Sequence, residues 1–415
     1  MKKEEFRRAL MYGFGSAIIF LKDCNNCEEY LDIIFDFSIH NYAFDSQCEG
    51  SRVRYLWDLI LASSNIEKLQ GQIMNKLEDN DSSIYHYQIY QLGVLFAQES
   101  EYNPIELMKR HFRYDKNYGS FVGETEIIEL DGDKGILFVA HKIAKRLQKD
   151  INYDGDYFFV NDLIDSFDKK YIDSLLHELL DTNKRFRQYY LSSLNPNNRV
   201  EKREKEDYSS LKLDLKEYQY NRIRPWSRFA TEEELKQVYY DINNSCDLEL
   251  ISKLMHAFYK KEYKGRIDRI VNFLDDTRYE LSESAVNVLK WKSDNRIRQK
   301  AIKLIATKNN WYEYVPLLFE NYEKGDYRLI LDKCNKEYDE FEWHEIQLTL
   351  NNFFSFHRNI DCQELYIKLY NNNRCTICRG EMFKYMLRDG FSDIHILNEA
   401  EWDVNLDIRR LVRGS

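Results

Sequence analysis

Apolar residues recur along most of the chain with the period of an α-helix. One early stretch carries its apolar side chains at positions i, i+3, i+4, i+7 and i+8, which would place them on a single helical face. These residues are Val53, Leu56, Trp57, Ile60 and Leu61. The next stretch repeats the pattern with Ile66, Leu69, Ile73 and Leu77. Only a short polar segment separates the two runs, so the pattern predicts a helical hairpin.

The stretch 125–147, TEIIELDGDKGILFVAHKIAKRL, has an Asp-Gly-Asp sequence that is compatible with the turn of a β-hairpin. Its second half instead follows the helical period over three turns, so we predict helix, turn and helix. Helical periodicity continues to about residue 193 and resumes after residue 230. The whole chain has four prolines, which favours long helical runs. The pattern therefore predicts an all-α fold.

The periodicity stops in one place, at NPNNRVEKREKEDYSS, residues 195–210. This segment combines turn-forming residues with a dense run of both charges, which is typical of a linker or mobile loop. We therefore expect an N-terminal helical lobe at 1–194, a charged linker at 195–212 and a C-terminal helical lobe at 213–415.

The most informative motif lies between residues 280 and 323. Asp294, Ile297, Arg298 and Ala301 stand as D-x-x-I-R-x-x-A at the start of a predicted helix. This resembles the second-helix signature of HEAT repeats, two-helix units that stack into α-solenoids. The resemblance implies that the Asp and Arg form a ladder between repeats and that the small Ala allows close helix packing. Weaker echoes occur at Val53-Arg54 and Ile408-Arg409. The expected fold is thus an α-solenoid of antiparallel helix pairs, a class that needs several stacked units.

Charge and hydropathy narrow the classes of partner. The formal net charge is −10, so the overall field opposes binding to a polyanion. The apolar run at 9–21 is too short to span a bilayer, and the charged residues on both sides of it disfavour a secretory signal. Eight cysteines in 415 residues suggest no disulfide framework. We therefore expect a cytoplasmic protein with no membrane partner, and its Asn-, Lys-, Ile- and Tyr-rich composition is compatible with a bacterial source.

Two C-x-x-C pairs are the candidate metal ligands: Cys24 with Cys27, and Cys375 with Cys378. Structural zinc requires four ligands, and two pairs at opposite ends of a solenoid would not meet. His40 or His395 could complete a local site, but neither stands at a known finger spacing. A redox dithiol would require a βαβ context that is missing. We expect structural thiols, no metal and no cofactor, with Cys375 and Cys378 as the remaining metal candidates.

Catalytic signatures are missing from the sequence. No H-E-x-x-H, G-x-S-x-G or P-loop motif occurs. Gly13 and Gly15 lie inside an apolar helical run, where glycine allows close packing of helices rather than binding of a dinucleotide. A non-catalytic protein is the expectation, although the sequence leaves enzymatic activity open.

Two segments are candidate partner-binding sites. Arg222, Arg224, Trp226 and Arg228 alternate with further aromatic residues from Tyr218 to Phe229, a composition used by interface hot spots and by platforms for single strands. Pro225 is expected to interrupt the helix, so that these side chains project from an irregular segment. The second candidate is the polar cluster of Asp45, Glu49 and Arg52, which could serve either recognition or helix capping with an ion pair.

A helical-repeat surface with abundant aromatic residues favours binding of an extended partner. We therefore expect a non-catalytic scaffold that holds a protein or peptide in the solenoid groove. The alternative is a nucleic-acid-binding HEAT-like protein such as a DNA glycosylase-type enzyme, supported only by the Arg-aromatic segment. Salt-dependent retention on DNA that depends on Arg222 and Arg224 would favour the alternative.

Overall fold

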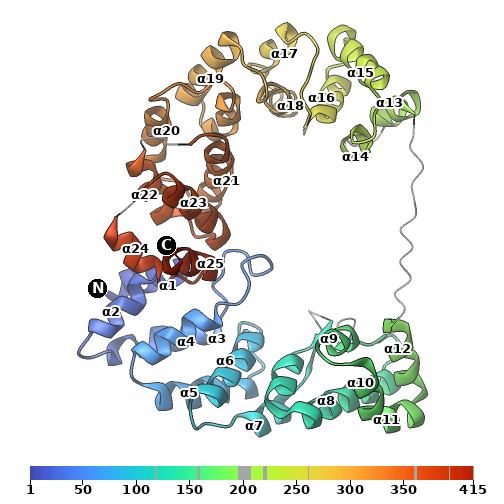
Figure 1. Ribbon diagram of the computed structural model, residues 1–415, viewed down its shortest axis with the longest axis vertical. Coiled ribbons are helices and arrows are strands. Elements are labelled where there is room, and N and C mark those ends of the chain that lie inside the picture. Colours follow the sequence, from blue (N-terminus) through green and yellow to red (C-terminus); the bar gives the residue numbers. More distant parts are fainter. Residues whose placement is uncertain are drawn as a thin grey trace. The chain divides into compact units, whose positions relative to one another are not determined.

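The computed structural model describes residues 1–116, 119–156, 159–194, 207–217, 222–259, 261–358, 362–391 and 393–414. Within these residues the regular secondary structure is almost entirely helical, so the all-α prediction is confirmed (Figure 1). The strands described are β1 (Tyr114–Asp115) and β2 (Ser120–Phe121), an antiparallel pair in which Tyr114 faces Phe121. No helix in the described part of the chain is long and apolar enough to cross a membrane.

Contacts between residues divide the chain into two compact units, one at 1–200 with 395–415 and the other at 201–394. The first unit thus joins the C-terminal segment to the N-terminal helices, which the predicted lobes at 1–194 and 213–415 did not anticipate. Residues 195–206 of the predicted linker lie outside the described residues, and its last residues begin a helix, α13 (Tyr208–Glu217).

The first unit is built from short helices that pack on their neighbours in sequence. In chain order its elements are α1 (Lys3–Tyr12), α2 (Ser16–Asp23), η1 (Glu28–Tyr30), α3 (Leu31–Ile39), α4 (Val53–Ala62), α5 (Ile66–Asn75), η2 (Lys76–Glu78), α6 (His86–Glu99), α7 (Ile105–His111), the strand pair, α8 (Glu124–Lys149), α9 (Phe159–Ser166), α10 (Lys169–Leu175), α11 (His177–Thr182), α12 (Lys184–Leu194) and α25 (Leu406–Arg413). Helix α24 (Ile394–Ala400) begins at the boundary of the two units.

Two predicted helix pairs in this unit are confirmed. Helices α4 and α5 form the hairpin, and their apolar faces supply core residues such as Trp57, Leu69 and Ile73. Leu61, at the end of the α4 face, is instead 39% exposed. Helix α8 is broken at Gly132, whose φ of 53° and ψ of −128° are not helical, so the segment is helix, turn and helix as predicted.

The second unit continues with α13, α14 (Ile223–Ser227), α15 (Glu232–Asn244), α16 (Leu248–Met255), η4 (His256–Phe258), α17 (Asp268–Phe273), α18 (Tyr279–Leu289), α19 (Asn295–Thr307), η5 (Trp311–Leu318), α20 (Tyr327–Cys334), α21 (Glu340–Phe356), α22 (Gln363–Asn372) and α23 (Thr376–Arg388). Many of these elements contact an element two or three places further along the chain: α16 packs on α18, α18 on η5, η5 on α21, and α21 on α23. A second series runs through α17, α19, α20 and α22 (Figure 1). Two series of this kind are what stacked helix pairs would produce.

The segment that resembles a HEAT repeat is well defined in this unit. The apolar residues predicted to line α18 and α19 are buried, among them Ala285, Ile297 and Ala301. Asp294 caps α19 by accepting a hydrogen bond from the amide of Arg296 at 2.8 Å. Arg298 reaches the next helical segment and pairs with Asp326 at 2.5 Å. The Arg298 contact is of the kind that the resemblance implies, whereas Asp294 accepts from Arg296 of its own helix. Membership of the HEAT class stays a prediction.

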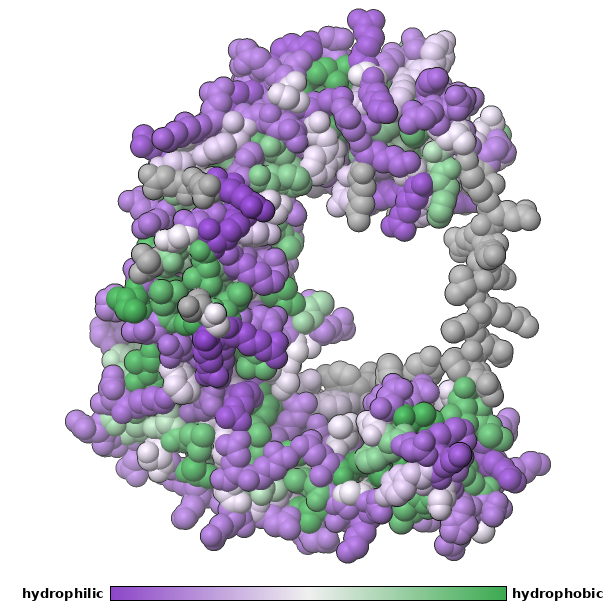
Figure 2. All heavy atoms as spheres, viewed as in Figure 1, coloured by the Kyte–Doolittle hydropathy of each residue, from purple (hydrophilic) through white to green (hydrophobic). Residues whose placement is uncertain are grey.

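Hydrophilic side chains dominate the visible face of the molecule, and hydrophobic ones show as patches among them (Figure 2). The largest fully buried side chains include Trp57, Tyr55 and Phe96 in the first unit and Trp311 and Tyr366 in the second. Each unit therefore has an aromatic core of its own, which accounts for part of the high aromatic content.

Candidate functional site: a cationic pocket

Two glycines near the N-terminus allow the C-terminal segment to pack closely in the first unit. Gly13 has a φ of +71°, and a side chain there would overlap Val404. A side chain at Gly15 would overlap the carbonyl oxygen of Glu399. The amide of Val404 donates to the carbonyl of Gly13 at 2.9 Å. The predicted role of these glycines in close packing agrees with this contact. Their predicted place inside a helical run is wrong, because Gly13 ends α1 and Gly15 precedes α2.

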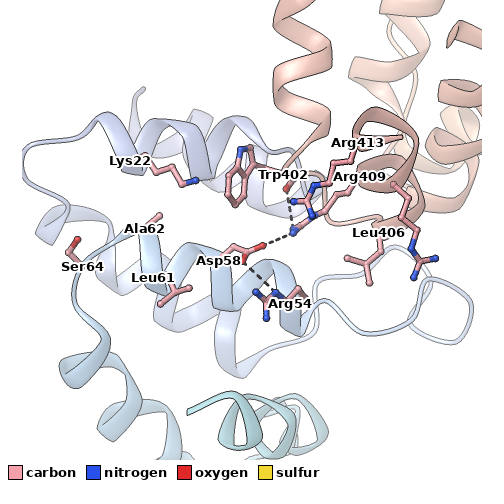
Figure 3. Close-up of a pocket in the computed structure, with 11 residues that line it drawn as sticks. Lys22, Arg54, Asp58, Leu61, Ala62, Ser64, Trp402, Leu406, Arg409 and Arg413 are labelled. Carbon is pink, nitrogen blue, oxygen red and sulfur yellow. Dashed lines mark hydrogen bonds and ion pairs between the residues drawn. The ribbon is translucent and has the colours of Figure 1, made fainter. Parts of the chain in front are cut away.

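A buried ion pair fixes the same segment to helix α4. Arg409 Nη1 lies 2.6 Å from Asp58 Oδ2, and the two side chains are only 6% and 7% exposed. Arg409 also donates to the carbonyls of Asp403 and Trp402, so its guanidinium is held on several sides. Arg54 approaches the same carboxylate at 3.7 Å (Figure 3). Asp58 therefore lies between two arginines from opposite ends of the chain.

A pocket of about 760 Å³ opens between these elements of the first unit (Figure 3). Its lining residues are Lys22, Arg54, Asp58, Leu61, Ala62, Ser64, Trp402, Leu406, Arg409, Arg410 and Arg413. Five of them are cationic, and Asp58 is the one carboxylate among them. The exposed Leu61, together with Trp402 and Leu406, supplies apolar surface. The site therefore combines positive charge with an apolar wall, and it draws on helices α2, α4 and α25 and on the segment between α24 and α25.

The cations differ in how far they are neutralised. Arg54 pairs with Glu99 at 2.8 Å, and Arg410 pairs with Asp407 at 2.9 Å. Lys22 Nζ lies 3.1 Å from the centre of the Trp402 ring, a cation–π contact that leaves its charge uncompensated. Arg413 contacts only the carbonyl of Glu401 at 3.5 Å. Within the described residues, Lys22 and Arg413 have no carboxylate partner, so the pocket keeps a surplus of positive charge.

The Arg-aromatic segment does not form the irregular platform that Pro225 was expected to create. Pro225 is in the first turn of the short helix α14, where a missing amide hydrogen costs nothing. Trp226 is buried and its ring lies 5.6 Å from that of Tyr208, while Arg222 pairs with Asp214. Arg228 is exposed. Tyr218 and Tyr220 lie outside the described residues. Trp226 is thus a core residue in the described part of the chain, and its predicted contact with a partner stays a prediction.

Arg224 belongs to a partly buried cluster in the second unit, in which His256 is the buried residue. Its Nη2 lies 2.9 Å from Nδ1 of His256, and its guanidinium carbon lies 4.4 Å from the centre of the Tyr259 ring. Burial, followed by the charge of Arg224, lowers the pKa of His256 to about 4. Lys290 covers the same ring at 4.5 Å, and burial lowers its pKa to about 8. The cluster stacks cations on an aromatic ring and ties α14 to η4.

The predicted polar cluster at 45–52 is structural. Asp45 accepts hydrogen bonds from the amides of Gln47 and Cys48 at 2.9 and 3.2 Å, which closes a turn. Glu49 pairs with Arg52 at 3.2 Å, and these side chains are 1% and 6% exposed. Arg52 also donates to the carbonyl of Met11 at 2.9 Å. Because the Glu49–Arg52 pair is buried, it holds the loop against α1 and offers no surface for recognition.

The two cysteine pairs fall in different units, and all eight cysteines are thiols. The thiol of Cys27 donates to the carbonyl of Leu21 at 3.5 Å, and burial raises its pKa to about 11. Cys375 and Cys378 instead lie beside His344, which the sequence analysis did not connect with them. The expected candidate His395 belongs to the first unit.

Neither the pocket nor the cysteine cluster can be interpreted from relatives, because no family model, curated protein or solved structure was found to match the chain.

Proposed function

We propose that this protein is a non-catalytic binding protein built from HEAT-like helical repeats, and that its pocket holds an acidic segment of a partner protein. The observation that supports this function is the lining of the pocket, which has five cations, one carboxylate and an apolar wall. A cavity of about 760 Å³ is within the range of roughly 300–1,000 Å³ that is usual for ligand sites. It suits a few consecutive side chains rather than a whole domain.

The cationic and apolar residues that line the pocket favour a peptide as its ligand. Asp and Glu side chains would replace water around Lys22 and Arg413, which are exposed and are oriented along the pocket (Figure 3). Arg410 is exposed as well and also lines the pocket. Apolar neighbours in the same segment would contact Leu61 and Leu406. Arginine forks bind carboxylates in a planar, two-point geometry, so side-chain carboxylates suit this lining.

A nucleic acid is the less favoured occupant. Phosphate backbones are bound by extended tracks of cations, because affinity increases with each phosphate neutralised. Here the cations gather in one pocket, and the chain as a whole carries a net charge of −10. The Arg-aromatic segment, the original reason for considering a nucleic acid, has its Trp226 buried.

The test measures fluorescence anisotropy of a labelled ten-residue peptide of alternating Glu and Leu, with the full-length protein as titrant. We expect saturable binding that weakens with added salt, since the cations involved are exposed. The double variant Lys22→Glu with Arg413→Glu should reduce affinity by at least tenfold. The matched control is Lys68→Glu with Lys145→Glu, which makes the same charge change at exposed positions of the same unit and should bind normally.

Two results would contradict the proposal. Equal loss of affinity in both double variants would indicate a general effect of net charge and no pocket. Tighter binding of a labelled single-stranded oligonucleotide than of the peptide, lost in the Lys22 and Arg413 variant, would show that the pocket serves a nucleic acid.

A further inference from the structure

A group of three potential metal ligands lies in the second unit, and none of the three lines the pocket of the first unit. The ligand atoms of His344, Cys375 and Cys378 all lie within 4.8 Å of one another, the one such group among the described residues that includes a cysteine. His344 Nδ1 and Cys378 Sγ are 3.7 Å apart. We propose that these three residues bind one Zn²⁺ ion, with a water molecule as the fourth ligand.

The distances agree with tetrahedral zinc. Zinc bonds of about 2.3 Å to sulfur and about 2.0–2.1 Å to nitrogen, at tetrahedral angles, place neighbouring ligand atoms roughly 3.6–3.8 Å apart. The 3.7 Å between His344 and Cys378 already has this value. The remaining separations, at most 4.8 Å, need to shorten by about 1 Å, which is within the reach of a side-chain rotation.

The C-x-x-C spacing places both sulfurs at the beginning of one helix. Cys375 is the N-cap residue of α23, and Cys378 follows in the first turn. The positive end of the helix dipole favours negative charge there, and zinc binds cysteine as the thiolate. The preceding loop is fixed, because Asn373 Oδ1 accepts from the amide of Cys375 at 2.6 Å and the carbonyl of Asn373 accepts from Arg379. The two thiols are therefore held in position before any metal binds.

Helix α21 supplies the third ligand and a polar stripe around it, of which Gln347 is the fully buried member. His344, Gln347 and Asn351 are spaced i, i+3 and i+7, so they share one face of α21, the helix that packs on α23. The side-chain amides of Gln347 and Asn351 both donate to the carbonyl of Cys378 at 3.0 Å. Gln347 is fully buried, yet its Oε1 has no hydrogen-bond partner in the described residues.

An unpartnered oxygen beside Cys378 is the second observation that points to a ligand. Leaving a buried polar atom unpaired is destabilising, and an ordered water molecule is the usual hydrogen-bond partner of such an atom. A zinc-bound water is a strong hydrogen-bond donor, and Gln347 Oε1 is the kind of acceptor that would hold it. Such contacts to a metal's own ligands commonly orient the site.

The chemical nature of the three ligands indicates which metal ion would bind. Two thiolates and one imidazole are typical of zinc, whereas Mg²⁺ and Ca²⁺ require oxygen ligands. Both cysteines are only 4% exposed, while His344 is partly exposed, so the site is open to solvent on the histidine side. Three protein ligands with one exchangeable position are also the pattern of zinc sites that exchange water for another ligand.

The experiment starts from the full-length chain, purified under reducing conditions and freed of metal by a chelator. Titration with Zn²⁺ against a colorimetric zinc indicator should give one equivalent per chain. Co²⁺ in place of Zn²⁺ should give the intense near-ultraviolet absorption of cobalt–thiolate bonds. Cys375→Ser, Cys378→Ser and His344→Ala should each weaken zinc binding by at least tenfold.

The chain contains its own control for thiol number. The double variant Cys24→Ser with Cys27→Ser removes the other C-x-x-C pair and should still bind one zinc. His344→Ala removes no thiol and leaves the helix N-terminus intact, so it tests the site even if a serine variant folds poorly. Retention of one zinc by His344→Ala at unchanged affinity would overturn the proposal. So would the absence of stoichiometric zinc binding by the reduced protein.

Discussion

The buried pair between Asp58 and Arg409 offers the sharpest test of how the first unit is held together. Replacing Arg409 with Met removes the guanidinium and keeps a side chain of comparable length. The carboxylate of Asp58, 7% exposed, would then have only Arg54 nearby, at 3.7 Å. The carbonyls of Trp402 and Asp403 would also lose a donor. We expect the C-terminal segment to detach from α4 more readily.

The expected loss of stability in Arg409→Met follows from the burial of the Asp58–Arg409 ion pair. Removing one partner of a buried ion pair typically costs about 3–5 kcal/mol, because the remaining charge is left without compensation. Arg54 is half exposed and can turn toward Asp58, so the lower end of that range, about 3 kcal/mol, is expected. Arg410 is one position further on the same helix, and its pair with Asp407 is exposed. Arg410→Met should therefore cost no more than about 1 kcal/mol.

Hydrogen exchange monitored by mass spectrometry can resolve the effect by segment in the intact chain. Since each 1.4 kcal/mol is a factor of ten, amides of α25 should exchange roughly a hundredfold faster in Arg409→Met. Amides of α21, in the other unit, should not change. The double variant Asp58→Leu with Arg409→Met removes both charges and should recover most of the protection. Acceleration of less than about threefold in α25 would refute the reasoning, as would equal acceleration in Arg410→Met.

Three further predictions concern the packing, capping and titration of single residues. Gly15→Ala should free the C-terminal segment and abolish acidic-peptide binding, because its side chain would overlap the Glu399 carbonyl; Gly71→Ala, with open space around it, is the control and should bind normally in the same anisotropy assay. Thr231→Ala should destabilise the second unit by about 1 kcal/mol in urea unfolding, since Thr231 and Glu234 form a reciprocal capping box at the start of α15; an unchanged midpoint would contradict the cap. Burial, and then the neighbouring carboxylates, raise the pKa of Glu124 to about 9, so the folded state retains a proton that the unfolded state releases above about 4.5, and stability falls as pH rises between these values. Glu124→Gln should flatten that slope and raise stability at pH 8, as measured by urea unfolding at pH 5 and pH 8; equal slopes in both proteins would show that Glu124 ionises normally.

Helical periodicity could predict the local structure because it depends on short spacings. The hairpin of α4 and α5, the break at Gly132 and the capping box at Thr231 all follow from residues within a few turns of each other. The resemblance of 294–301 to a repeat helix located a well-formed pair, α18 and α19. Such signals need no knowledge of distant segments.

The candidate sites were harder to predict because each joins segments far apart in sequence. Gly13 and Gly15 indicated close packing, but the sequence contains nothing that names Val404 as the neighbour. Arg409 was noted only as part of a repeat echo, although it pairs with a residue 351 positions away. The expectation that the Arg-aromatic side chains are exposed relied on local composition alone. In the structure, Trp226 is instead buried and packs beside the ring of Tyr208.

For the group of His344, Cys375 and Cys378, one signal in the sequence could have predicted that His344 lies beside the cysteines. A histidine, a glutamine and an asparagine at i, i+3 and i+7 form a polar stripe on α21, a helix otherwise rich in buried aromatic and aliphatic residues. Buried polar residues must be satisfied by partners, so such a stripe indicates that something polar faces it. The C-x-x-C pair is a natural partner, because helices adjacent in a stack of pairs lie about thirty residues apart. His344 and Cys375 are separated by about that interval. The HEAT-like repeats proposed above would therefore bring a histidine on α21 to two cysteines at the beginning of α23, the helix on which α21 packs.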